Sequence, residues 1–274
     1  MDSLGQVNFP GEIAAGLGGV LVCAVGFYMV RSVIGMSTTV KNRYNDVLPY
    51  TLPSSYTPHV VIKQDVKTHG TKANPLLPSE NERSGIEFSY GFFLWVDQST
   101  FSGQVALKNV FYKGYDSRPW PLIAPGVFMR SDVNTMVIVL NSYTNSFNSI
   151  EVVNMPIEKW VHVLLNFQKN ALEVHINGRI ADKLLFTNTT PYLNFENLIF
   201  FSNYTGTITL PVGSQEPLVF AGPISGKISN VVYTRYALSF NEIQKQLGNR
   251  PSRNIPSDAE DSTVNLSDTW WTNQ

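Results

Sequence analysis

Two histidines, His162 and His175, are the residues whose spacing comes nearest to a metal site. They fall on neighbouring predicted strands, and pairing about the turn after Gln168 places them diagonally on one face, which Glu173 shares. A zinc ion needs three or four ligands, and neither a cysteine nor a third histidine lies nearby. We therefore expect histidines at the surface or rim of a sheet, and we predict no metal and no cofactor.

Carboxylates are the next candidates, because glycosidases place two of them across a cleft, one as the acid and one as the nucleophile or base. The nearest acidic cluster, Glu80, Glu82 and Glu87, falls in a predicted loop and at a strand start. The alternating acidic spacing of a calcium loop is missing from the sequence as well. We predict that the protein is not an enzyme. The loop aspartates that we expect to form turns instead of binding calcium are Asp97, Asp116 and Asp132.

Aromatic residues gather at a loop that we predict over residues 113–125. Tyr112, Tyr115 and Trp120 are the candidate ligand contacts there. Sugar-binding sites use loop aromatics with polar neighbours, and protein interfaces are enriched in Trp, Tyr and Arg. The sequence leaves three interpretations open: a glycan site, a protein interface, or rings packed over the end of a sheet.

The elements that must position these side chains are β-strands. Residues 160–168 alternate between apolar and mixed positions, the period-two pattern of a strand with one buried face. Residues 172–176 alternate in the same way, and Asn177 and Gly178 both tolerate the positive φ of a type I′ turn. Residues 180–186 supply the next strand. The pattern therefore predicts a three-stranded antiparallel meander inside a β-rich domain.

Composition supports a β-rich chain and excludes one class of partner. The chain has 274 residues, of which 15% are charged and 12% aromatic, with 19 glycines and 16 prolines, which suits short strands joined by turns. The net charge of −1 gives no electrostatic basis for a nucleic-acid partner. Cys23 is the single cysteine in the sequence, which excludes an intrachain disulfide and favours a reducing compartment.

An apolar stretch near the N-terminus predicts a membrane anchor. Residues 13–30 carry no charge, and the apolar run continues to residue 36. About 20 apolar residues cross a bilayer core of roughly 30 Å, so we predict one transmembrane helix over residues 13–36. A signal peptide is the alternative, although the segment is long for one and no basic region precedes it. The anchoring residues are Ile13, Val20, Phe27, Val30 and Arg31.

Flanking charge predicts the orientation of this helix. Apart from the amino terminus, only acidic charges precede it, whereas Arg31, Lys41 and Arg43 follow. The positive-inside rule then places the C-terminal part of the chain on the cytoplasmic side of the membrane.

The rest of the chain divides where its composition changes. Residues 1–12 form a polar segment, and residues 37–84 are interrupted by prolines, which predicts a Pro-rich stalk. Residues 85–248 form the β domain and residues 249–274 a polar tail. The pair Trp270 and Trp271 in this tail is either a docking peptide for a partner or an incidental feature of a mobile end.

A short helix closes the β domain. Ser239 is a good N-cap and Glu242 stands three residues later, which is the spacing of a capping box. Phe240, Ile243 and Leu247 form an apolar stripe that would dock on a sheet.

Three separated segments carry a family resemblance. Their sequences are FSYGFFLWV at 88–96, WVHVLLNFQKNALEVHING at 160–178 and GKISNVVYTRYALSFNEI at 226–243. In this order they resemble the laminin-G-like domains of the concanavalin A-like lectin/glucanase group. The resemblance implies an all-β fold, a concanavalin A-like two-sheet jelly roll over residues 85–248. The glucanases of that group carry E-x-D-x-x-E or a close variant on one strand, and this sequence lacks it.

These observations predict a non-enzymatic, membrane-anchored structural or interaction protein whose jelly roll binds other proteins. The layout resembles membrane-anchored proteins of large DNA viruses, which implies a virion protein that links an inner membrane to a capsid. The alternative is a membrane-displayed, carbohydrate-binding lectin with a glycan partner. A degenerate glucanase is the third candidate.

Overall fold

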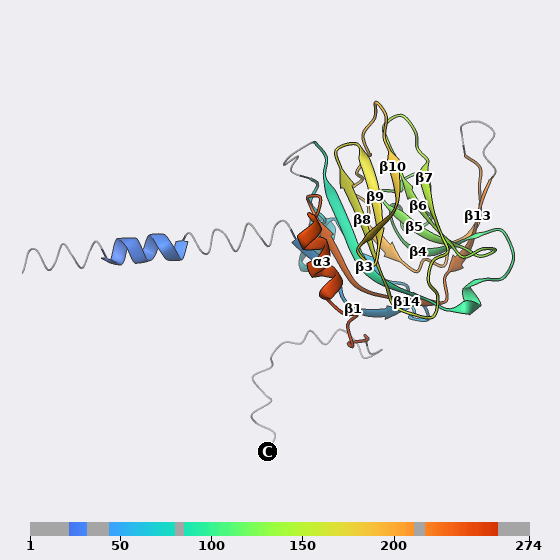
Figure 1. Ribbon diagram of the computed structural model, residues 1–274, viewed down its shortest axis with the longest axis horizontal. Helices are drawn as coiled ribbons and strands as arrows, with labels where there is room; N and C mark the ends of the chain where they lie inside the picture. Colours follow the sequence, from blue (N-terminus) through green and yellow to red (C-terminus); the bar gives the residue numbers. More distant parts are fainter. Residues whose placement is uncertain (1–21, 32–43, 80–84, 211–216, 257–274) are drawn as a thin grey trace, which may run out of the picture. The chain divides into compact units, whose positions relative to one another are not determined.

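The computed structural model describes residues 22–31, 44–79, 85–210 and 217–256 (Figure 1). The chain divides into two compact units, residues 1–44 and residues 45–274. In the first unit, residues 22–31 form an α-helix. Within the described ranges, none of the helices has the length and apolar character needed to cross a bilayer. Most of the predicted membrane helix over 13–36, including Ile13 and Val20, lies outside the described residues, so that prediction stays a proposal.

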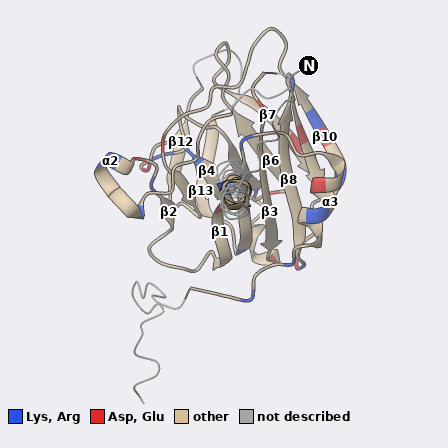
Figure 2. Cartoon of the chain, turned by 90° about the vertical axis from the view of Figure 1, so that its left-hand side faces the viewer, with Lys and Arg blue, Asp and Glu red and all other residues tan. Residues whose placement is uncertain are grey.

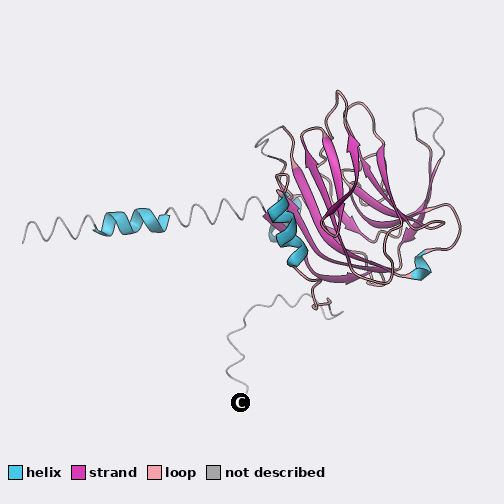
Figure 3. Ribbon diagram, in the orientation of Figure 1, coloured by secondary structure: helices cyan, strands magenta, loops and turns pink. Residues whose placement is uncertain are grey.

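The second unit is built almost entirely from strands (Figure 3). Its six-stranded sheet has the order β1-β14-β3-β8-β9-β10. The strands of this sheet are β1 (Tyr44–Pro53), β14 (Gly226–Thr234), β3 (Phe88–Val96), β8 (Val161–Gln168), β9 (Ala171–Ile176) and β10 (Arg179–Leu185).

The eight-stranded sheet has the order β12-β13-β4-β5-β6-β7, and β11 joins it by pairing with β4 and with β2. Strand β13 runs parallel to β4, whereas β4, β5, β6 and β7 are antiparallel to their neighbours in turn. The strands of this sheet are β2 (Val61–Ile62), β4 (Leu107–Lys113), β5 (Gly126–Arg130), β6 (Thr135–Leu140), β7 (Asn148–Val153), β11 (Leu198–Phe200), β12 (Thr205–Ile208) and β13 (Leu218–Pro223). The described helical elements of this unit are α2 (Val66–His69), η1 (Gly70–Lys72), η2 (Gln98–Thr100) and α3 (Phe240–Gly248).

The main core lies between the two sheets. Phe92 on β3 meets Phe111 on β4 edge to face, with ring centroids 5.2 Å apart, and Phe111 also lies 5.6 Å from Phe200 on β11. All three side chains are fully buried. Two packed sheets around one apolar core confirm the predicted all-β, two-sheet architecture. The cartoon in Figure 2 shows Lys and Arg positions scattered among Asp and Glu positions along the described chain.

The meander predicted over residues 160–186 is confirmed. Strand β8 pairs antiparallel with β9, which pairs with β10. Asn177 and Gly178 join β9 to β10 with φ values of 50° and 78°, the positive values that the turn requires. The apolar positions Val163 and Leu165 are buried in the core between the sheets, as the alternation predicts.

The stalk predicted over residues 37–84 is replaced in part by a strand of the domain. Strand β1 occupies residues 44–53 and forms the edge of the six-stranded sheet beside β14. Leu48 and Leu52 on this strand are fully buried or nearly so, at 0% and 1% exposed. Proline is tolerated at a sheet edge because an edge strand needs only one of its two hydrogen-bonding sides. The position of Pro49 on an edge strand explains why this proline is compatible with a strand, although it contributed to the prediction of a stalk.

The polar tail predicted over residues 249–274 also begins as part of the domain. The backbone carbonyl of Asn254 accepts a hydrogen bond from the backbone N–H of Thr51 at 2.8 Å. Thr51 Oγ1 donates to the carbonyl of Ser252 at 2.6 Å. The tail therefore adds to the β1 edge as far as the described residues extend, and the predicted docking pair Trp270 and Trp271 lies outside them.

Helix α3 starts at the predicted capping box and packs on the outer face of the six-stranded sheet. Glu242 Oε2 accepts a hydrogen bond from the backbone N–H of Ser239 at 2.8 Å. Ile243 then packs against Leu164 on β8 and Leu238. At the C-terminal end of the helix, the side chain of Gln246 reaches Gly91 on β3 so closely that no larger residue fits there without movement.

This helix overturns the expectation for the two histidines. His162 and His175 are 3% and 5% exposed. They share the outer face of β8 and β9 with Leu164, which pairs directly with His175 and packs under α3. The surface or rim location predicted for them is wrong, because alternation shows which way a residue points but not whether a helix from elsewhere in the sequence covers it.

Candidate binding site on the loops

Three loops meet at one end of the sandwich. They connect β4 to β5, β6 to β7, and β10 to β11. The backbone N–H of Tyr192 donates to the carbonyl of Asn141 at 2.9 Å, and that of Gly114 donates to the carbonyl of Asn197 at 2.9 Å. Ser142 and Pro191 form an isolated β-bridge. The loops therefore hold one another in place through backbone contacts.

These loops present four aromatic side chains to solvent. Phe195 is 76% exposed, Tyr143 70%, Tyr115 38% and Tyr192 36%. The rings of Tyr143 and Tyr192 meet edge to face, with centroids 5.3 Å apart and planes at 89°. We refer to Tyr115, Tyr143, Tyr192 and Phe195 as the aromatic loop patch. Large exposed rings held on tied loops are typical of a recognition surface.

The structure separates the three aromatic residues that the sequence analysis singled out. Tyr112 is fully buried, and its hydroxyl donates to the carbonyl of Tyr115 at 3.1 Å. Trp120 is 9% exposed and lies 6.2 Å from Phe147, ring to ring. Two of the three rings therefore follow the packing interpretation, and Tyr115 is the one that a ligand can reach.

Tyr143, Tyr192 and Phe195 were not among the site residues predicted from the sequence. No local motif marks them, because they stand in two loops about 50 residues apart in the sequence, and the rings of Tyr143 and Tyr192 meet only through the fold. The available signal is compositional. Residues 141–147 and 186–195 carry aromatic, amide and hydroxyl side chains but no charge.

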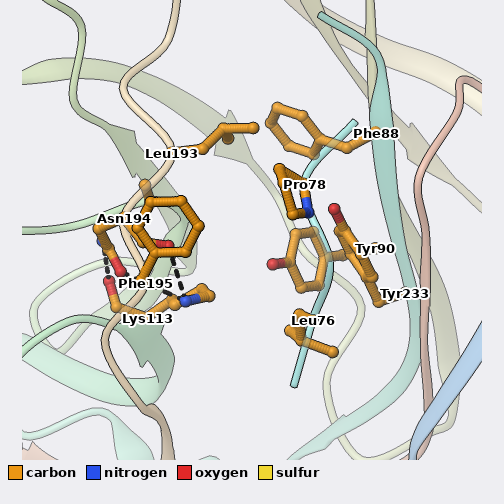
Figure 4. A pocket seen from close by; sticks show the side chains of 10 residues that line it. Leu76, Pro78, Phe88, Tyr90, Lys113, Leu193, Asn194, Phe195 and Tyr233 are labelled. Atoms are coloured by element: carbon orange, nitrogen blue, oxygen red, sulfur yellow. Dashed lines mark hydrogen bonds between the residues drawn. The ribbon is translucent and has the colours of Figure 1, made fainter. Parts of the chain in front are cut away.

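A buried lysine fixes the loop that carries Tyr192 and Phe195 (Figure 4). Lys113 is 4% exposed, and its Nζ donates to the backbone carbonyls of Asn194 at 2.8 Å and Glu196 at 2.6 Å. Asn194 Nδ2 donates back to the carbonyl of Lys113 at 2.9 Å. Burial lowers the pKa of Lys113 to about 8, because the ammonium loses its hydration. Lys113 therefore acts as a positioning residue for the patch.

A small pocket lies beside this lysine. Figure 4 shows Lys113 and Asn194 on one side, with Leu76, Tyr90 and Tyr233 facing them. Its volume is about 20 Å³, which is room for roughly one water molecule. The pocket is too small for a sugar or a metabolite.

Replacing Lys113 with methionine is expected to loosen this loop. The variant leaves the carbonyls of Asn194 and Glu196 without their donor, and we expect a loss of about 1–3 kcal/mol in the free energy of unfolding. Hydrogen exchange should accelerate selectively over residues 192–197. As a control, Lys183→Met removes a half-exposed lysine and should change stability by less than about 0.5 kcal/mol. Equal exchange rates in the Lys113 variant and the parent protein would refute the positioning role.

The carboxylates near the patch do not form a hydrolytic pair. Asp116 accepts hydrogen bonds from Lys63 Nζ and Asn197 Nδ2, each at 2.8 Å. Partial burial raises the pKa of Asp116, but these two donors outweigh it and lower the pKa overall. A glycosidase general acid needs a raised pKa instead. Glu87 is 1% exposed immediately before β3, and Glu80 and Glu82 lie outside the described residues.

The loop aspartates have protein partners. Asp97 Oδ1 accepts from Trp95 Nε1 at 2.7 Å, and Asp132 is bonded to Arg130. Among the residues that the structure describes, no three His, Cys, Asp or Glu side chains gather closely enough to hold a metal ion.

Comparisons with known proteins identify no family. No protein-family model matches the sequence, and no curated protein matches it either. Membership of the laminin-G-like group therefore stays a prediction.

Solved structures show partial similarity to the chain. The ligand-binding domain of botulinum neurotoxin serotype D in complex with N-acetylneuraminic acid is 10% identical, with a TM-score of 0.43 over 60% of this chain and 36% of that chain. A structure of botulinum neurotoxin type C, a toxin whose cell entry is dependent upon interaction with two ganglioside molecules, is 14% identical. Its TM-score is 0.45 over 75% of this chain and 45% of that chain. Trypanosoma rangeli sialidase is 13% identical, with a TM-score of 0.38 over 59% of this chain and 22% of that chain. This chain spans less than half of each, and similarity at this level establishes neither a family nor a function.

Proposed function

We propose that this protein is a non-enzymatic, carbohydrate-binding protein and that the aromatic loop patch is its glycan site. The observation that carries the proposal is the exposure of Tyr143 and Phe195, at 70% and 76%, on loops tied to one another. A sugar ring presents a face of C–H groups that packs on an aromatic ring, while its hydroxyls need hydrogen-bonding partners at the edge. The patch offers the aromatic rings on a preformed surface, which lowers the entropic cost of binding.

The side chains around the patch supply those hydrogen-bonding partners. Thr144, Asn145, Asn188 and Thr190 are exposed on the same two loops as Tyr143 and Tyr192. Amide and hydroxyl groups both donate and accept, as sugar hydroxyls do. The two loops carry no charge between residues 141–147 and 186–195, which favours a neutral oligosaccharide over an acidic one.

Binding of the full chain to an array of neutral and sialylated glycans tests this proposal. We expect neutral glycans to bind, and Phe195→Ala or Tyr143→Ala to weaken binding by about tenfold or more, as removal of a central aromatic contact does. Phe240→Ala is the matched control, because Phe240 is 70% exposed on α3, outside the patch. Undiminished binding in both patch variants would exclude the patch as the glycan site.

A membrane-anchored interaction protein is the second candidate. The described helix of residues 22–31 exposes Val22 at 72%, Phe27 at 69% and Val30 at 58%. A helix with apolar residues on all sides is stable when something apolar surrounds it, and the uncharged run over 13–30 suits a bilayer. In this proposal the β domain faces the cytoplasm and binds proteins, including a capsid if the protein belongs to a virion. An array without glycan binding, together with sedimentation of the full chain on liposomes, would favour this candidate over the first.

A further inference from the structure

A second concave site lies on the outer face of the eight-stranded sheet. It is a groove of about 720 Å³ that spans residues from β4, β5, β6, β7, β12 and β13. None of the four residues of the aromatic loop patch lines it. Pockets that hold small organic ligands enclose about 300–1,000 Å³, so the groove has the size of a small-molecule site.

The floor and walls of the groove are apolar. Val137 and Leu107 form the floor and are 4% and 8% exposed. Val105 and Val219 line the walls and are 68% and 41% exposed. Because these wall residues are apolar and open to water, covering them with an apolar ligand is favourable.

One side of the groove is charged, and its balance is negative. Arg130 is bonded to Asp132 by its Nε at 3.0 Å and its Nη2 at 2.6 Å, so its positive charge is already neutralised. Glu151 lies farther from the guanidinium, at 3.8 Å from Nη1. Its side chain is 51% exposed and lines the groove. The single guanidinium of Arg130 faces the carboxylates of both Asp132 and Glu151. The three groups therefore carry a net negative charge, which we assign to Glu151 because it lies farther from the guanidinium.

We propose that this groove binds a small amphiphilic ammonium compound, with its apolar body on Val105, Leu107 and Val137 and its cationic nitrogen at Glu151. The groove offers a partner for each half of that ligand: apolar surface on the floor and walls, and at the side the carboxylate of Glu151, which Arg130 neutralises only in part. An anionic amphiphile would meet the same apolar surface but would be repelled by Glu151, and Arg130 is already engaged by Asp132.

Three probes of matched length separate these contributions. Decylammonium, decanol and decanoate share one apolar body and differ in the charge of the head group, and each is titrated into the full chain below its aggregation concentration by calorimetry at pH 7. We expect decylammonium to bind about threefold to fivefold more tightly than decanol, the range of a partly exposed ion pair, and decanoate to bind more weakly than decanol. Equal affinities for the three probes, or no binding at all, would overturn the proposal.

Two variants separate the head-group contact from the apolar one. Glu151→Gln should abolish the advantage of decylammonium over decanol while leaving decanol binding unchanged. Val105→Asp should weaken decanol and decanoate by about tenfold, because it places a carboxylate on the apolar wall, whereas the same carboxylate attracts decylammonium and offsets part of the loss for that probe. Val66→Asp is the control for the second variant, since Val66 is also exposed, at 53%, but lies on α2 outside the groove. Unchanged decanol affinity in Val105→Asp would show that the probes bind elsewhere.

Binding of decylammonium in the groove is independent of the proposed glycan binding on the loops. Phe195→Ala, which should impair glycan binding, should leave decylammonium affinity unchanged. Loss of decylammonium binding in Phe195→Ala would place the probe on the loops and overturn the assignment to the groove.

Discussion

Phe111→Ala is expected to lower the free energy of unfolding of the β domain by about 3–5 kcal/mol. Phe111 stands on β4, in the eight-stranded sheet, and contacts Phe92 and Tyr90 of the six-stranded sheet at 5.2 Å and 6.3 Å between ring centroids. It also touches Phe200 within its own sheet. Truncation removes a ring that both sheets share and leaves a cavity that rigid strands on two sides cannot close.

Chemical denaturation of the variant and the parent protein measures this effect. Phe240→Ala removes a phenylalanine that is 70% exposed and should change stability by no more than about 0.5 kcal/mol. A loss below about 1 kcal/mol for Phe111→Ala would mean that the two sheets do not pack through this ring. Because a loss of this size is a large share of a typical domain's stability, near-ultraviolet circular dichroism should also be used to check that the variant folds.

The fold was predictable where local patterns decide it. The period-two alternation of residues 160–168 and the Asn177-Gly178 turn predict strands, register and hairpin from adjacent residues alone, and the structure confirms them. Strand β1 was not predictable in this way. Its prolines indicate a linker when read locally, and only its place at a sheet edge makes them compatible with a strand.

The candidate site was less predictable, because it depends on what covers each surface. Tyr112 and Trp120 belong to a second apolar cluster, together with Phe128 and Phe220. This cluster lies on the face of the eight-stranded sheet that points away from the main core, so both faces of the sheet are buried there. Two aromatic residues of a loop-like sequence are therefore core residues. Tyr143 and Tyr192 belong to different loops and come together by tertiary contacts, which no spacing in the sequence encodes.

Acidification should destabilise the domain through the histidines beneath α3. Burial and, to a smaller extent, the neighbouring His175 together lower the pKa of His162 from 6.5 to about 4. The pKa of His175 is lowered as well, by burial, although Glu173 at 3.5 Å opposes that shift. Within the described residues, Nδ1 of His162 has no hydrogen-bond partner that would stabilise a bound proton. Gln246 of α3 brings no charge to this face, and Lys183 pairs with Glu173.

The direction of this pH dependence follows from how many protons the folded and the unfolded states bind. Below pH 6.5 the unfolded chain takes up a proton on His162, whereas the folded protein keeps this side chain neutral until about pH 4. The unfolded state therefore binds more protons in this window, and stability falls as the pH is lowered. A shift of this size corresponds to about 3 kcal/mol lost between pH 6.5 and pH 4.

Urea denaturation between pH 7.5 and pH 4 measures this loss, and His162→Leu isolates its source. Leucine takes up no proton, and it can pack against Phe93, whose ring centroid lies 5.0 Å from that of His162. The variant should therefore show a flatter pH dependence and should exceed the stability of the parent protein near pH 4.5. His69→Gln changes an exposed histidine of α2 and should retain the steep dependence. If His162→Leu loses stability with pH as steeply as the parent protein, the acid sensitivity originates elsewhere, and α3 does not shield His162 from protonation.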